Sequence, residues 1–199
     1  MNRTMVLAAL GAMLQAGGLC AQKSGNTGFM VGLHAVPMGL DGVGTEAFEE
    51  EGMGLGLTLG YGFSEHIALY TTVDAGYVEY DPDNPLARGE DYESVTVDLG
   101  ARVSLGGVYR RVRPYVDAAI TGVATSEDAE SGTSITSGGG VTVGGGLQYF
   151  YTRGWALNAG VQFTSGAFTE VEVDGRREEF ESGDAFVHTR VQLGVVWHP

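Results

Sequence analysis

Residues 53–63 read MGLGLTLGYGF, and every second residue of this stretch is large and apolar. The odd-numbered positions carry Met, Leu, Tyr or Phe, and the even-numbered positions carry only Gly or Thr. Successive side chains of a β-strand point to opposite faces, so the stretch predicts a strand with one large apolar face and one face of small residues.

The same period of two recurs along the chain and predicts eight strands, at residues 29–36, 53–63, 67–77, 95–105, 115–124, 141–150, 155–164 and 185–197. An even number of strands of about ten residues is typical of barrels that cross a membrane. We therefore predict an all-β fold, an eight-stranded antiparallel up-and-down transmembrane β-barrel.

The connections between these strands are predicted to alternate in length. Residues 64–66, 106–114 and 151–154 are short and fit periplasmic turns, whereas residues 37–52, 78–94, 125–140 and 165–184 fit longer extracellular loops. All Asp and Glu residues except Glu65, Asp74, Asp98 and Asp117 fall in these loops, which are therefore predicted to be acidic. An Asp174-Gly175 turn signal suggests that the last two strands continue as a hairpin.

Lipid, rather than water, is predicted to cover the apolar face. In a soluble barrel the other face meets water and carries many charges, but here it carries mainly Gly, Thr, Ser and Ala, which suits a narrow lumen. Aromatic residues near the strand ends fit the interfacial girdles of membrane barrels: Phe63, Tyr77, Tyr149, Trp155 and Trp197. A net charge of -14 argues against binding of nucleic acid.

The N-terminus has the layout of a secretory signal, with a short basic start, an apolar run at residues 5–14 and small residues up to Ala21. We predict export through the Sec pathway, cleavage of residues 1–21, and a mature barrel domain at residues 22–199. Cys20 is the only cysteine, so this cleavage leaves a mature chain without a disulfide.

Four segments carry a resemblance to a known group of proteins: GYGFSEHIALY at 60–70, RRVRPYVDAA at 110–119, GGGLQYFYTRGWALNAGVQF at 144–163 and VQLGVVWHP at 191–199. The chain resembles the small outer-membrane β-barrels of the OmpA transmembrane domain, OmpX and OmpW types. This resemblance implies an outer-membrane location, contact with lipid and lipopolysaccharide, and insertion by the barrel-assembly machinery. It does not define an activity, because the fold hosts adhesins, anchors, weak channels and lipid-modifying enzymes.

The end of the chain resembles the last-strand signal that the barrel-assembly machinery reads. Val191, Leu193, Val195 and Trp197 match that pattern. His198 and Pro199 follow the tryptophan, whereas the usual signal ends on the aromatic residue.

Charged residues inside the strands are out of phase with their apolar neighbours and are predicted to point into the lumen. If Leu105 faces Pro114, then Arg102 faces Asp117. The expected lumen charge network is Arg102, Asp117, Arg190, Asp74, Asp98 and His188. These charges suit either a gate or neutralisation in a filled core; we favour the filled core, because eight strands leave little interior space.

Other patterns give weaker indications. Two acidic groups, Asp81 with Asp83 and the run Glu49 to Glu51, offer oxygen ligands for divalent cations, but a solvated surface is the favoured interpretation. His188 and His66 lack a third catalytic partner, so neither a catalytic residue nor a cofactor or metal is predicted. The sequence favours a closed barrel with a structural or surface role through its loops; the alternatives are a narrow solute channel and, less favoured, a lipid-modifying enzyme.

Overall fold

The protein is an antiparallel barrel of eight strands. The computed structural model describes residues 27–42, 49–78, 91–106, 111–129, 132–173 and 176–199. The strands are β1 (Gly28–Gly42), β2 (Glu49–Gly62), β3 (Ile67–Val78), β4 (Tyr92–Ser104), β5 (Val112–Ala129), β6 (Gly132–Phe150), β7 (Trp155–Val173) and β8 (Arg176–Trp197). Each strand pairs with its neighbours in sequence, and β1 pairs with β8, which closes the barrel and confirms the predicted fold class.

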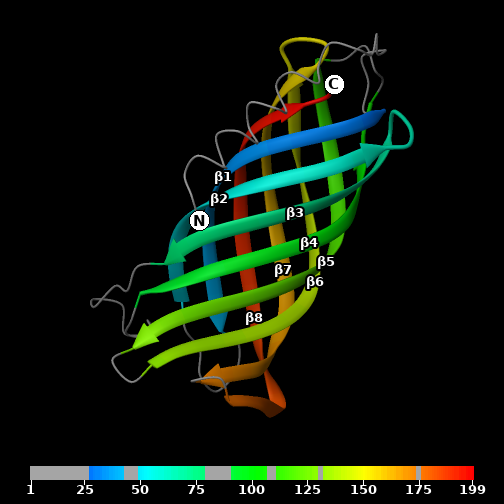
Figure 1. Ribbon diagram of the computed structural model, residues 1–199. Coiled ribbons are helices and arrows are strands. Elements are labelled where there is room, and N and C mark those ends of the chain that lie inside the picture. The colour runs from blue at the N-terminus through cyan, green and yellow to red at the C-terminus, as the bar shows by residue number, and fades with distance from the viewer. Residues whose placement is uncertain (1–26, 43–48, 79–90, 107–110, 130–131, 174–175) are drawn as a thin grey trace.

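The two ends of the barrel differ (Figure 1). One end, here called the turn end, holds the connections 63–66, 105–111 and 151–154 together with the start of β1 and the end of β8. Gly106 has a φ of 96°, a conformation that favours glycine, where the chain leaves β4. The opposite end, here called the loop end, holds the other four connections. Short turns are periplasmic in outer-membrane barrels, so the turn end corresponds to the periplasmic end that the sequence predicts.

The outer wall is apolar along the middle of the strands. Large apolar side chains alternate with buried ones, and Leu55, Leu99, Ile120 and Val141 are each at least 60% exposed. Such a surface is unfavourable in water and matches a lipid environment. No helix long and apolar enough to cross a membrane occurs among the described residues.

Three of the four predicted loops are largely strand instead. The predicted loop 37–52 is largely occupied by β1 and β2, which pair up to Asp41 and Glu49. The predicted loop 125–140 is largely occupied by β5 and β6, which pair up to Ala129 and Gly132. The predicted loop 165–184 is likewise occupied by β7 and β8, which pair up to Val173 and Arg176, as the hairpin signal suggested. The prediction ended each strand where the apolar alternation stopped, but backbone pairing continues with polar side chains beyond the lipid.

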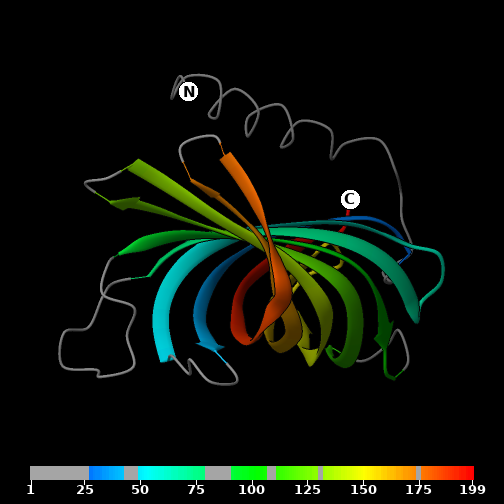
Figure 2. The ribbon, with the colours of Figure 1, turned by 90° about the horizontal axis from the view of Figure 1, so that it is seen from below.

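The outer segments of β7 and β8 are irregular. The β7–β8 register shifts between Phe168 and Glu170, and the β6–β7 register shifts between Ser137 and Gly138. Such bulges bend a strand. In the view from the loop end, the outer β7–β8 segment passes in front of the barrel (Figure 2).

The lumen is filled in layers. An apolar cluster lies toward the loop end and consists of Leu40, Val78, Tyr92, Val123, Phe168 and Phe186. A second cluster lies toward the turn end and consists of Met30, Ala68, Tyr70, Ala119 and Val196. Buried polar side chains fill the space between the two clusters.

Candidate functional site in the barrel lumen

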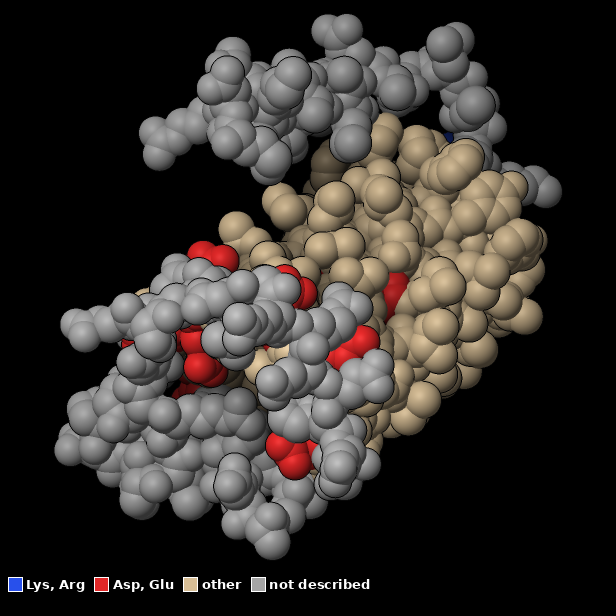
Figure 3. Space-filling model, turned by 60° about the horizontal axis from the view of Figure 1, so that its bottom comes forward, with Lys and Arg blue, Asp and Glu red and all other residues tan. Residues whose placement is uncertain are grey.

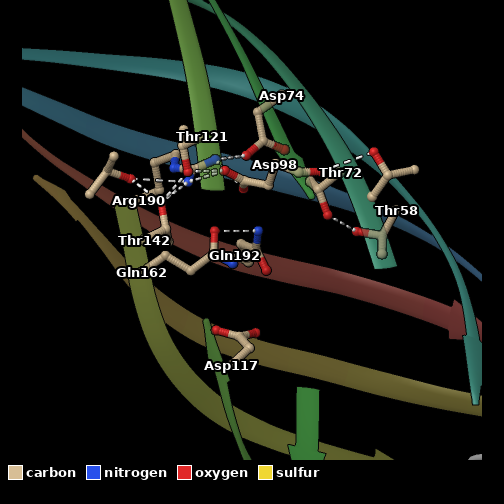
Figure 4. A network of polar contacts seen from close by, with 12 residues as sticks. Thr58, Thr72, Asp74, Asp98, Asp117, Thr121, Thr142, Gln162, Arg190 and Gln192 are labelled. Atoms are coloured by element: carbon tan, nitrogen blue, oxygen red, sulfur yellow. Dashed lines mark hydrogen bonds and ion pairs between the residues drawn. The ribbon is translucent and has the colours of Figure 1, made fainter. Parts of the chain in front are cut away.

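Arg190 is the centre of the polar layer. Its guanidinium donates to Asp74 Oδ2 at 2.7 Å, and to Asp98 Oδ2 and Oδ1 at 2.8 and 3.1 Å. All three side chains are fully buried. Two carboxylates from β3 and β4 therefore share one cation from β8, across the lumen (Figure 4).

Threonine hydroxyls complete a circuit around Arg190. Thr121 donates to Asp98 Oδ1 at 2.7 Å and also contacts Thr142. Thr142 in turn contacts Thr164 at 2.6 Å, and Arg190 donates to the Thr164 hydroxyl at 3.3 Å. β5, β6 and β7 each supply one hydroxyl, so side chains of β4 to β8 form a closed ring of hydrogen bonds.

His34 from β1 joins this layer. Its Nε2 lies 2.9 Å from Asp74 Oδ1, the oxygen that Arg190 leaves free. Gly56 lies opposite His34 in β2, and a Cβ at that position would collide with both the His34 ring and the Asp74 carboxylate. The glycine therefore makes room for this contact. The set of His34, Asp74, Asp98, Thr121, Thr142, Thr164 and Arg190 is called the central network below.

A second ion pair lies closer to the turn end and is separate from the central network. Arg102 donates to Asp117 Oδ2 at 2.9 Å, between residues paired directly across β4 and β5. The Arg102 guanidinium also lies 3.8 Å from the Tyr115 ring centre and 5.3 Å from that of Tyr70. The aromatic rings enclose the cation, which favours one fixed position of the arginine.

The turn end of the lumen is covered by residues from β5, β6 and the C-terminus. The Arg113 guanidinium lies 4.5 Å from the Phe150 ring centre, and the His198 ring packs on the same phenylalanine at 5.4 Å. The His198 amide donates to Gly154 O at 2.7 Å, which holds the end of the chain in place. Burial, together with Arg113 and Arg102, lowers the pKa of His198 from 6.5 to about 4.

A small cavity lies between the central network and the Arg102–Asp117 pair. Its volume is about 10 Å³, enough for about one water molecule. Its lining includes His34, Arg102, Asn158 and Gln192. Arg102 Nε and Asn158 Oδ1 have no hydrogen-bond partner among the described residues.

The structure brings five of the six predicted lumen residues into two ion-paired groups and leaves His188 apart. His188 is buried and lies opposite Leu40, toward the apolar cluster, and its Nδ1 has no partner among the described residues.

No described hydrogen bond joins the imidazole of His188 or His66 to a hydroxyl. Within the part of the chain that the structure describes, no cluster of His, Cys, Asp and Glu is arranged to hold a metal ion. Asp81 and Asp83, and the signal segment 1–21, lie outside the described residues.

Sequence reasoning missed His34, the threonine circuit and the Arg113–Phe150–His198 cover. The alternation of β1 could have indicated that His34 points into the lumen, because Met30, Gly32 and His34 lie on the same face of the strand. The contact with Asp74 depends on how the strands are staggered around the barrel, which no local pattern contains.

In the predicted assembly signal, Val191, Leu193 and Val195 occupy outward positions of β8, and Trp197 packs on Trp155 at 6.2 Å.

A family model described as outer membrane protein beta-barrel domain matches residues 4–198. The chain belongs to this family. Its location is therefore the outer membrane, and the apolar wall of the barrel is the surface that meets lipid. No curated protein matches the chain.

Solved structures of other members of this architecture are similar. Neisserial surface protein A has a TM-score of 0.64 and 18% identity, over 87% of this chain and 98% of its own. OprG from Pseudomonas aeruginosa has a TM-score of 0.62 and 14% identity, over 89% and 100%. Ail, the attachment invasion locus protein of Yersinia pestis, has a TM-score of 0.53 and 11% identity, over 86% and 99%. At these identities the similarity shows the fold.

Proposed function

We propose that this outer-membrane protein is a closed barrel that acts at the cell surface through its loop end. In this proposal it neither passes solutes nor catalyses a reaction. The observation that carries the proposal is the central network, in which Arg190, Asp74 and Asp98 meet across the lumen with no exposed surface. The proposal includes export through the Sec pathway, cleavage of the signal peptide at residues 1–21, and insertion by the barrel-assembly machinery.

The remaining lumen layers support closure. Apolar side chains lie on the loop side of the central network, and the Arg102–Asp117 pair and the Arg113–Phe150–His198 cover lie on the turn side. A solute would have to displace all of these layers. Separating a buried ion pair costs about 3 to 5 kcal/mol when one charge is left without a partner.

The loop end supports a role in contacting other molecules. Several Asp and Glu side chains gather there, whereas the wall of the barrel carries little charge in this view (Figure 3). The outer segments of β5, β6, β7 and β8 extend there to Ala129, Gly132, Val173 and Arg176 and provide a paired backbone for that surface. We propose lipopolysaccharide as the partner for this end, held through divalent cations that its phosphates share with these carboxylates.

A narrow channel is the second candidate, and one observation favours it. Several buried polar atoms in the lumen have no partner among the described residues, and water in a permeable lumen would satisfy them. They belong to Tyr70, Thr96, Gln148, Asn158 and Gln162.

Solute entry into proteoliposomes distinguishes the two candidates. The refolded wild-type barrel is expected to admit neither amino acids nor small sugars, whereas Arg190→Ala and Arg102→Ala are expected to increase entry because they remove lumen cations. Arg153→Ala, a change at an exposed turn residue, is the matched control. Steady entry through the wild type would favour the channel.

The surface role has its own test. Purified lipopolysaccharide is added to the wild-type barrel and to a variant in which a glycine-serine linker replaces residues 79–90. Weaker binding by the variant supports the proposal. Equal binding argues against this loop as the contact.

A further inference from the structure

Two exposed arginines lie on neighbouring turns at the turn end. The Phe150 amide donates to Arg111 O at 2.8 Å, which joins the start of β5 to the end of β6. Arg153 lies in the connection that follows β6. Both side chains are exposed, and no ion pair within the described residues involves either of them.

The charge at this end is opposite in sign to that of the whole chain. The chain has a net charge of -14, and its acidic side chains gather at the loop end. Glu65 is the only acidic residue among the described residues of the three turn-end connections. An exposed positive surface in an otherwise acidic protein attracts an anionic partner.

Aromatic side chains locate these arginines relative to the membrane. Tyr149 and Tyr151 are 40% and 48% exposed, and Trp155 and Trp197 pack together at the same end. Exposed Tyr and Trp near strand ends lie at the level of the lipid headgroups. Arg111 and Arg153 therefore lie where the headgroups of the periplasmic leaflet carry their phosphates.

Arg113 is a different case and does not belong to this surface. Its side chain is only 3% exposed, and its guanidinium packs over the Phe150 ring at 4.5 Å. Arg113 therefore helps to fill the lumen, whereas Arg111 and Arg153 are exposed at the turns.

We propose that Arg111, Arg153 and Tyr151 form an interaction surface for anionic phospholipids of the periplasmic leaflet. The guanidinium fork matches phosphate oxygens and binds them through paired hydrogen bonds. The tyrosine contributes an amphipathic ring at the boundary between the headgroups and the acyl chains. This inference rests on the outer-membrane location and is independent of whether the lumen is closed.

The test measures lipid binding to the refolded full-length barrel in a neutral detergent. Native mass spectrometry is used to titrate phosphatidylglycerol and phosphatidylcholine against the wild type and the Arg111→Gln, Arg153→Gln double variant. The wild type is expected to prefer phosphatidylglycerol. A basic residue near an anionic membrane surface contributes about fivefold in affinity, so the double variant is expected to lose about 25-fold for phosphatidylglycerol. Its affinity for phosphatidylcholine is expected to stay unchanged.

Two control variants sharpen the result. Glu65→Gln removes an acidic side chain from the same end and is expected to raise the affinity for phosphatidylglycerol. Glu93→Gln removes an exposed acid near the start of β4, at the loop end, and is expected to have no effect. Retained heat-modifiable migration on gels establishes that each variant is folded.

Two results would overturn the inference. The first is equal affinity of the wild type for both phospholipids, and the second is an unchanged preference for phosphatidylglycerol in the double variant.

Discussion

Replacing Arg190 with methionine should destabilise the barrel more than any exposed substitution. The change removes the cation that holds Asp74 and Asp98 at 2.7 and 2.8 Å and leaves two fully buried carboxylates without it. Loss of one partner of a buried pair costs about 3 to 5 kcal/mol, and two carboxylates place the expected loss at the upper end, about 5 kcal/mol. The equilibrium between folded and unfolded protein would then shift by more than about a thousandfold.

A variant that also neutralises both acids tests the cause of this loss. In Arg190→Met with Asp74→Asn and Asp98→Asn, no buried charge of the cluster is left, so the free energy of unfolding is expected to recover to within about 2 kcal/mol of wild type. The assay is reversible urea unfolding in zwitterionic vesicles, followed by the fluorescence of Trp155 and Trp197 and extrapolated linearly to zero urea. Arg153→Gln is the control and is expected to change stability by less than about 0.5 kcal/mol. The reasoning is refuted if Arg190→Met costs less than about 1 kcal/mol, or if the triple variant is as unstable as the single one.

Three further predictions use the same unfolding and gel assays. Gly56→Ala is expected to lower the free energy of unfolding by about 1 to 3 kcal/mol, because the added Cβ collides with the central network. Gly32→Ala, whose Cβ would meet its nearest neighbours at 3.4 Å, should change it by less than about 1 kcal/mol. Equal effects of the two substitutions would contradict this packing. The unfolded chain binds a proton at His198 near pH 6.5, whereas the folded chain binds it only near pH 4. Lowering the pH from 6.5 to 4 should therefore lower the free energy of unfolding of the wild type by up to about 3 kcal/mol. An equally steep decrease in His198→Phe would assign the effect to another group. Trp197→Ala is expected to lower the fraction of folded, heat-modifiable barrel in cells, and an unchanged fraction would argue against this tryptophan as part of an assembly signal.

Strand orientation could be predicted from the sequence because it depends only on a local period of two. The phase of Arg102 and Arg190 relative to their apolar neighbours was enough to turn both side chains inward, and the structure buries both. The register of Arg102 with Asp117 followed from the turn between β4 and β5, where the Leu105 amide donates to Pro114 O at 2.7 Å.

Features that depend on the closed shape of the barrel could not be predicted in this way. The contact between His34 and Asp74 joins β1 to β3 over Gly56 of the intervening β2, and the ring of threonine hydrogen bonds depends on the stagger of β4 to β8. The length of the β5–β6 hairpin was missed because both strands continue with polar residues, whereas the Asp174-Gly175 turn signal indicated the β7–β8 hairpin. The end of the apolar pattern marks the lipid boundary and not the strand end.

The most direct test of a closed lumen is the single-channel conductance of the refolded wild-type barrel in a planar bilayer at neutral pH, alongside Arg102→Ala and Arg190→Ala. The account predicts no steady conductance for the wild type and new openings in at least one variant. A reproducible wild-type current that both substitutions alter would contradict it and make the lumen charges a gate.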